Sequence, residues 1–120
     1  MTIAEAAERS GLSIDTIRFY EKSGLLPPIR RDGRGWRSFS EADLDWLVTL
    51  RRLQATGMPL ADMTAFARSA HGPEPESRSQ QVLRRDILRR HADRLARQRA
   101  ELEACEAYLA HKLTVYGDTP

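Results

Sequence analysis

The chain has 120 residues, of which 41% are hydrophobic and 30% are charged. A chain of this length forms one modest domain, or a small domain with one appended helix. No stretch approaches the roughly 18 consecutive apolar residues of a membrane span, and the first residues lack the pattern of a secretion signal, so we expect a cytoplasmic protein. The single cysteine, Cys105, excludes an intrachain disulfide and a cysteine-based zinc cluster.

The first 24 residues predict two short helices joined by a tight turn. Thr2, with Glu5 three residues later, begins the first helix, and Gly11 ends it. Ser13 begins the second helix, which Gly24 ends. Two short helices connected in this way are typical of a helix-turn-helix.

A stretch rich in glycine and arginine follows the second helix. Pro27 and Pro28 end the helical unit, because neither can extend a helix. Residues 30–39 combine a turn-forming Asp-Gly with aromatic residues around an arginine, which predicts a small hairpin, or wing. Six basic and two acidic residues between positions 18 and 37 leave a local charge of +4. This charge fits phosphate contact, but it also fits a solvated arginine-rich loop, and charge alone does not decide between them.

Two further helices complete a predicted domain over residues 1–70. Ser40 and Asp43 mark the start of a helix that extends through Gln54 and carries an apolar stripe. Pro59 suits the start of the next helix, which is predicted from about Leu60 to Ala70.

The remaining residues predict a linker and one long helix. Residues 71–78 contain two prolines and no large apolar side chain, as a linker does, whereas 79–116 contain no glycine or proline and 117–120 form a tail. A leucine, and finally Tyr116, recurs every seven residues along the helix, as in a coiled coil. The second seam is polar, which fits a modest two-stranded interface or an antiparallel pairing. The predicted dimerisation residues are Leu88, Leu95, Leu102, Leu109 and Leu113.

Three collinear segments resemble the MerR family of bacterial transcription regulators. Residues 16–26 resemble its second-helix signature, 35–44 its arginine–aromatic wing, and 53–60 its junction between the third and fourth helices. The resemblance implies a mainly α fold: a winged helix-turn-helix domain, followed by a long C-terminal helix that forms an antiparallel dimeric coiled coil. It also implies a homodimer that binds a pseudo-palindromic promoter and distorts it to control RNA polymerase through indirect readout.

The resemblance further implies that the second helix enters the major groove of DNA. Arg18 is the first candidate for a groove or phosphate contact, because a surface pair with a neighbouring carboxylate contributes little. Tyr20 is a candidate phosphate donor or a core aromatic residue, and Ser13 is a candidate contact or only a cap. Phe19 stands where the family often has tyrosine, and we expect it mainly to pack.

The wing is expected to lie on the DNA backbone next to that groove. Arg34 and Arg37 are its candidate phosphate contacts, while Trp36 and Phe39 are expected to hold the hairpin against the rest of the domain. Together with the second helix, this predicts DNA contacts at Ser13, Thr16, Arg18, Tyr20, Arg34, Trp36 and Arg37.

The sequence leaves the signal of such a regulator unassigned. Residues 108–116 are similar to the tail of the aldehyde- and thiol-stress branch of the family, but Arg52 stands where that branch often has a reactive cysteine. With one cysteine, we expect no metal site and no cofactor, and any small-molecule effector stays unidentified. No acid pair, nucleophile set or phosphate loop indicates an enzyme. The alternative function is a coiled-coil adaptor for other proteins, without specific DNA binding.

Overall fold

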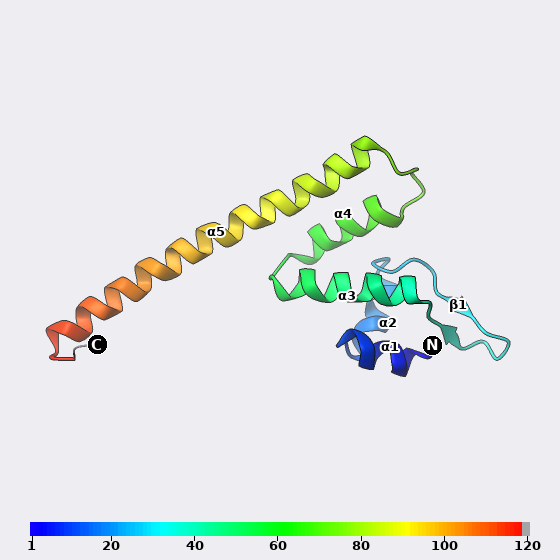
Figure 1. The fold of residues 1–120 in the computed structure, drawn as a ribbon, viewed down its shortest axis with the longest axis horizontal. Coiled ribbons are helices and arrows are strands. Elements are labelled where there is room, and N and C mark those ends of the chain that lie inside the picture. The colour runs from blue at the N-terminus through cyan, green and yellow to red at the C-terminus, as the bar shows by residue number, and fades with distance from the viewer. Residues whose placement is uncertain (119–120) are drawn as a thin grey trace. The chain divides into compact units, whose positions relative to one another are not determined.

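The computed structural model describes residues 1–118 and divides into two compact units, Met1–Ile87 and the residues from Leu88 onward. The described residues form five helices and one antiparallel hairpin (Figure 1), which confirms the mainly α fold with a wing and a long last helix. The predicted tail lies partly outside the described residues, at 119 and 120. The bounds are α1 Ile3–Ser10, α2 Ile14–Lys22, β1 Arg30–Arg31, β2 Arg37–Ser38, α3 Glu41–Ala55, α4 Leu60–His71 and α5 Arg78–Val115.

The first three helices begin at side-chain caps. Thr2 and Ser13 each accept a hydrogen bond from the backbone N–H three residues later, at 3.1 Å. At α3 the cap is reciprocal: the Ser40 hydroxyl accepts from the Asp43 N–H at 3.1 Å, and the Asp43 carboxylate accepts from the Ser40 N–H at 2.8 Å. These bonds satisfy N–H groups that the helices themselves leave unpaired.

Gly11 makes the tight turn between α1 and α2. Its φ of +79° lies in the left-handed region that side chains disfavour. A Cβ at this position would also lie 3.1 Å from Cδ of Arg51, which belongs to α3. The turn therefore requires glycine for its backbone conformation and for its close contact with α3.

The core of the first unit is one cluster of buried side chains to which α2 and α3 both contribute. Ile17 and Tyr20 are the buried residues of α2, and Leu47 and Leu50 of α3 are fully buried in the same cluster. Ile87, in the first part of α5, is 1% exposed and belongs to this cluster. The boundary between the two units therefore falls inside α5, whereas the sequence suggests a division at 71–78; the domain limits stay a prediction.

An aromatic cluster joins α3 to α4. The Trp46 indole N–H donates to the Leu25 carbonyl at 2.8 Å, which ties α3 to the segment after α2. The same indole stacks on Phe66 at 6.0 Å between ring centroids, and the His71 ring meets it edge-on at 4.4 Å. Aromatic contacts of this kind contribute about 0.5–1.5 kcal/mol each beyond the area they bury.

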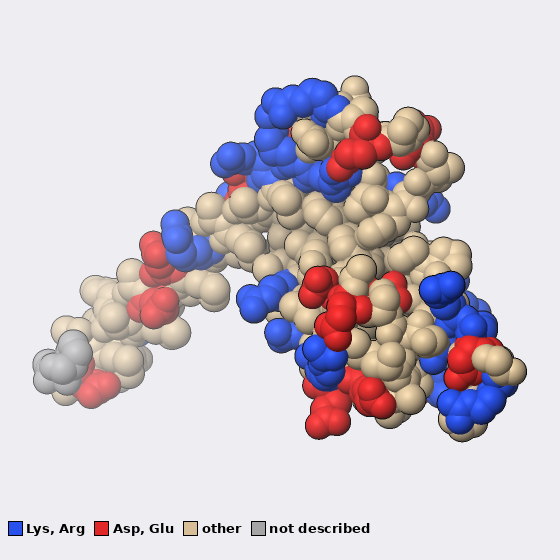
Figure 2. Space-filling model, turned by 45° about the vertical axis from the view of Figure 1, so that its right-hand side comes forward, with Lys and Arg blue, Asp and Glu red and all other residues tan. Residues whose placement is uncertain are grey.

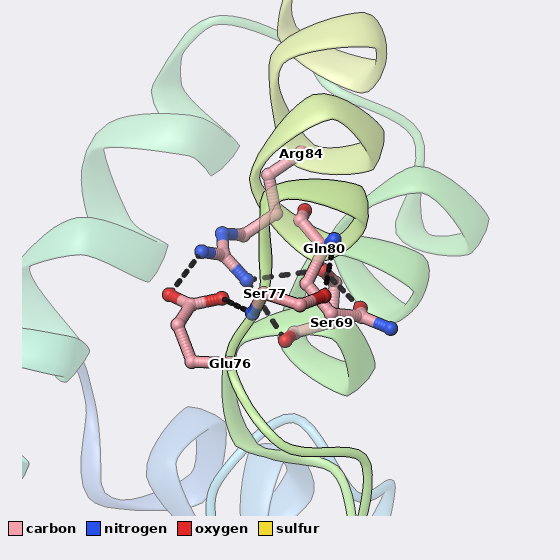
Figure 3. Close-up of polar contacts among 5 residues, drawn as sticks. All are labelled: Ser69, Glu76, Ser77, Gln80 and Arg84. Carbon is pink, nitrogen blue, oxygen red and sulfur yellow. Dashed lines mark hydrogen bonds and ion pairs between the residues drawn. The ribbon is translucent and has the colours of Figure 1, made fainter.

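The segment between α4 and α5 is fixed by a polar network (Figure 3). Arg84 donates to the Ser69 carbonyl at 2.8 Å and to the Glu76 carboxylate at 2.6 Å. The Ser69 hydroxyl donates to the Gln80 side chain at 2.8 Å, and the Ser77 hydroxyl accepts from the Gln80 N–H at 3.2 Å. The start of α5 is thus bonded to the last turn of α4 and to the connecting segment.

We expect His71 to make the first unit less stable in mild acid. Desolvation against the protein lowers the pKa of His71 from 6.5, the Arg84 charge lowers it further, and Asp43 opposes both effects. Because the unfolded chain binds the proton more tightly, this stabilisation is present above about pH 6.5 and is lost as the pH falls through the folded pKa. Wild type should therefore lose more stability than His71→Phe between about pH 7.5 and about pH 5.

Urea unfolding at equal protein concentrations measures this difference. Phenylalanine keeps a ring against Trp46 and cannot titrate, so the contributions of all carboxylates cancel between the two proteins. Equal losses of stability in the two proteins would contradict the prediction.

Candidate nucleic-acid interface

A groove of about 470 Å³ lies in the first unit between α2, the wing and the start of α1. We call it the wing groove. Its lining brings together four arginines, Arg18, Arg31, Arg34 and Arg37, with Asp32 as the single carboxylate among the lining residues. On the face shown in Figure 2, basic side chains gather around the wing at the right of the view. A concave surface with this charge attracts phosphate.

Arg18 extends from the middle of α2 and is only weakly held. Its Nη1 lies 3.9 Å from a carboxylate oxygen of Asp15, and both side chains are mostly exposed. An exposed pair at this distance contributes little, so Asp15 hardly restrains the guanidinium. At the N-terminus of the same helix, the Ser13 hydroxyl donates to the Thr16 hydroxyl at 2.8 Å, at the end of α2 that favours anions.

The tip of the wing is held by one carboxylate. Asp32 accepts hydrogen bonds from the N–H groups of Arg34 at 2.8 Å and of Trp36 at 3.1 Å. These two backbone bonds, followed by the Arg34 side chain, keep the pKa of Asp32 below its usual range. The Arg34 guanidinium lies 4.3 Å from the centre of the Trp36 ring, in cation–π geometry.

The two aromatic residues of the wing have different environments. Phe39 is 3% exposed and packs in the core, as expected. Trp36 is 60% exposed, so the expectation that it holds the hairpin against the domain is wrong. Its ring supports Arg34 instead.

Arg37 joins the wing to α2. Its Nε donates to the Glu21 carboxylate at 2.6 Å, and both side chains are mostly buried. A charge-assisted bond at this depth is stronger than an exposed ion pair. Arg37 therefore determines where β2 lies against α2, and its predicted contact with DNA stays a prediction.

The two aromatic residues of α2 lie on different sides of the helix. Tyr20 is 3% exposed, burial raises the pKa of its hydroxyl, and that hydroxyl donates to Gln54 of α3 at 3.1 Å. This places the Tyr20 ring in the core, which was one of its two expected roles. Phe19 is 48% exposed, so the expectation that it mainly packs is wrong: α2 turns Ile17 and Tyr20 inward and leaves Phe19 outside.

Arg31 is a member of the site that sequence reasoning did not select. It lies directly opposite Arg37 in the hairpin, lines the wing groove, and donates to the Gly35 carbonyl at 3.3 Å. The sequence pointed to Arg31 only through its position in the segment with the +4 charge. That segment contains six basic residues, and only the pairing of β1 with β2 indicates which of them share a face.

The long helix presents a row of exposed apolar residues. The five predicted dimerisation leucines are all exposed in the single chain, and Cys105 is exposed as well. Within residues 1–118, no three His, Cys, Asp or Glu side chains are grouped so that they could hold a metal ion. None of the helices in this part of the chain is long and apolar enough to cross a membrane.

We expect Glu21→Gln to loosen the wing without unfolding the domain. It replaces a mostly buried charge-assisted bond by a weaker neutral one, which should cost about 1–2 kcal/mol locally. Hydrogen exchange of the β1 and β2 amides should then accelerate by about 5- to 30-fold. Asp15→Asn is the matched control, because its ion pair with Arg18 is exposed and long, and the wing amides should be unaffected. Equal exchange in wild type and Glu21→Gln would show that the ion pair does not position the wing.

Two family models match the chain. The model described as MerR HTH family regulatory protein matches residues 1–69, and the model described as MerR, DNA binding matches residues 44–112. An HTH-type transcriptional regulator from Haemophilus influenzae is 52% identical over 66 residues, which cover 55% of this chain but only about half (49%) of that relative. The HTH-type transcriptional regulator YyaN from Bacillus subtilis is 33% identical over 123 residues, covering 96% of this chain and 89% of the relative.

One similar solved structure contains DNA. HiNmlR, a MerR family regulator lacking the sensor domain, was crystallised bound to promoter DNA; its TM-score with this chain is 0.75 at 37% identity, over 96% of this chain and 88% of HiNmlR. The matched models together extend from the helix-turn-helix through most of α5. The chain therefore belongs to the MerR family of helix-turn-helix regulators and is a DNA-binding transcription regulator.

Proposed function

We propose that the chain binds a pseudo-palindromic promoter site as a homodimer and controls RNA polymerase by changing the shape of that site. The observation that carries this proposal is the wing groove, where arginines from α2 and from the wing line one concave surface. A helix in the major groove, with a hairpin on the adjacent backbone, holds the DNA at two places. Bending or untwisting the DNA between two such heads changes the spacing of promoter elements, which is the physical basis of indirect readout.

We assign the DNA contacts by how each side chain is held. Arg18 is the base or phosphate contact of α2, because its pair with Asp15 is weak. Arg34, stacked on the exposed Trp36, is a phosphate contact of the wing tip. Arg37 holds the wing in place through Glu21, and its remaining N–H groups contact the DNA backbone.

The other predicted contacts have smaller roles. Ser13 and Thr16 approach a phosphate at the N-terminus of α2. Tyr20 anchors α2 to the core and makes no DNA contact, because its hydroxyl is already bonded to Gln54 of α3.

We propose that α5 pairs with α5 of a second copy in antiparallel orientation. The leucines at 88, 95, 102 and 109 form one exposed row, and in a single chain this row would stay in water. Between Arg78 and Arg99 the helix has eight arginines and two aspartates, whereas from Ala100 to Val115 it has three glutamates and one lysine. Antiparallel pairing sets the basic part of each helix beside the acidic part of the other, and parallel pairing would set like charges together.

We assign no catalytic activity to the chain, in line with relatives that are transcription regulators. Bacterial promoter DNA lies in the cytoplasm, so the proposed function places the protein there. The competing candidate is a coiled-coil adaptor whose arginines are only solvated surface. The wing groove favours the regulator, because an adaptor would not need arginines from two separate elements on one concave face.

Promoter binding tests the contacts. On a duplex selected from random DNA with the full chain, Arg18→Ala and Arg34→Ala should each weaken binding by about 1–3 kcal/mol and reduce the slope of log affinity against log salt by about one unit. Arg85→Ala is the matched control, because this exposed arginine lies on α5 and pairs with Asp86. Binding that is weak and indifferent to sequence in wild type would support the adaptor instead.

Solution mass tests the dimer. Replacing both Leu95 and Leu102 with asparagine should weaken the dimer by about 100-fold or more, because four leucines per dimer lose apolar burial. Leu83→Asn is the control, since this exposed leucine of α5 lies outside the heptad row. Analytical ultracentrifugation should give a two-chain mass for wild type and the control, and a one-chain mass for the double variant. A wild type that stays monomeric at micromolar concentrations would exclude the proposed pairing.

A further inference from the structure

A second groove lies in the first unit, where the C-terminal ends of α2 and α4 approach the wing. We call it the proline groove, because Pro27 and Pro28 line it together with Leu26, Ile29 and Ala67. Its volume is about 510 Å³, and these apolar side chains make up about half of its lining residues; we call them the proline floor. Small-molecule sites in proteins commonly have volumes of roughly 300–1,000 Å³, apolar walls and a few polar groups. The groove therefore has the size and the floor of a site for a small organic molecule.

The charges at the proline groove favour an anion. Arg31 and Arg68 line it, and the only carboxylate of the lining, Glu21, is already bonded to Arg37 at 2.6 Å. The ends of two helices contribute partial negative charge, about one unit together, so the two arginines leave a net charge of about +1. Within residues 1–118, the Arg68 guanidinium has no hydrogen bond or ion pair of its own. A carboxylate would supply its partner.

Arg31 connects the proline groove to the wing groove, because it lines both. In the hairpin it lies directly opposite Arg37, whose ion pair with Glu21 joins the wing to α2. A ligand that attracts the Arg31 guanidinium into the proline groove therefore removes a positive charge from the DNA-facing side. It also moves the hairpin residue that pairs with Arg37, which is bonded to Glu21 of α2.

We propose that the proline groove binds a small organic acid, with its apolar body on the proline floor and its carboxylate between Arg68 and Arg31, and that this binding weakens promoter affinity. The second half of the proposal rests on the proposed function, whereas the ligand site does not. Linkage requires the reverse effect as well: promoter DNA must weaken binding of the acid by the same factor.

The binding experiment uses the full chain and 2-naphthoate as the probe, with neutral 2-naphthylmethanol as its analogue. Heteronuclear NMR should show saturable shifts at residues 26–29 and at Gly72, and the neutral analogue should bind about tenfold more weakly, because it lacks the charge-assisted bonds. Arg68→Gln should weaken binding of naphthoate by about tenfold, whereas Arg85→Gln, an exposed arginine outside the groove, should leave it unchanged. Equal binding of the neutral analogue, an unchanged affinity in Arg68→Gln or the absence of saturable shifts would each overturn the site.

The promoter experiment tests the coupling. Saturating naphthoate should weaken promoter binding several-fold and lower its salt slope by about one unit, as expected when one arginine leaves the phosphate surface. Arg68→Gln should bind the promoter normally without naphthoate and respond less to it. Naphthoate that binds in the groove and leaves promoter affinity unchanged would overturn the coupling. If the ligand-free protein does not bind a promoter at all, the proposed function fails, and the NMR arm still decides the ligand site.

Discussion

The candidate nucleic-acid interface depends on α2, a nine-residue helix that is marginal alone in water. Nucleation is so unfavourable that isolated helices shorter than about 12–15 residues are marginal, and α2 is stabilised because it buries one side in the core of the first unit. Ile17 and Tyr20 supply that side, and Gly11 brings α1 close enough for the turn to rest on Arg51. Every exposed residue of α2, including Arg18, takes its position from this buried contact.

The wing has even less internal support, since each of its strands has two residues. A hairpin of that size is not stable by itself. Here Asp32 orders the tip and the buried bond between Arg37 and Glu21 attaches the base to α2. The same arginine-rich segment is therefore organised by two carboxylates, one at each end. The arginines of this segment would repel one another in a free loop. In the fold, some of them form bonds that hold the wing in place, and the others face solvent.

The parts of the fold set by local chemistry could be predicted from the sequence. Helix starts at Thr2, Ser13 and Ser40 each depend on a side chain that accepts from the N–H three residues later, and the long helix depends on one regular repeat. The roles of Phe19 and Tyr20 could not be separated, because a helix of nine residues has too few turns for its period to show which neighbour points inward. The bond of Glu21 with Arg37 and the network around Arg84 join residues 8 to 16 positions apart, across turns whose geometry no local pattern specifies.

The division of charge along α5 has a consequence for a cell that contains several regulators of this family. A helix that is basic in its first part and acidic in its second matches a copy of itself in antiparallel orientation. A related helix with evenly spread or reversed charge would leave arginines facing arginines, which costs free energy even where the leucine rows fit. In the proposed pairing, the charge pattern therefore disfavours mixed dimers and favours a dimer of two identical chains.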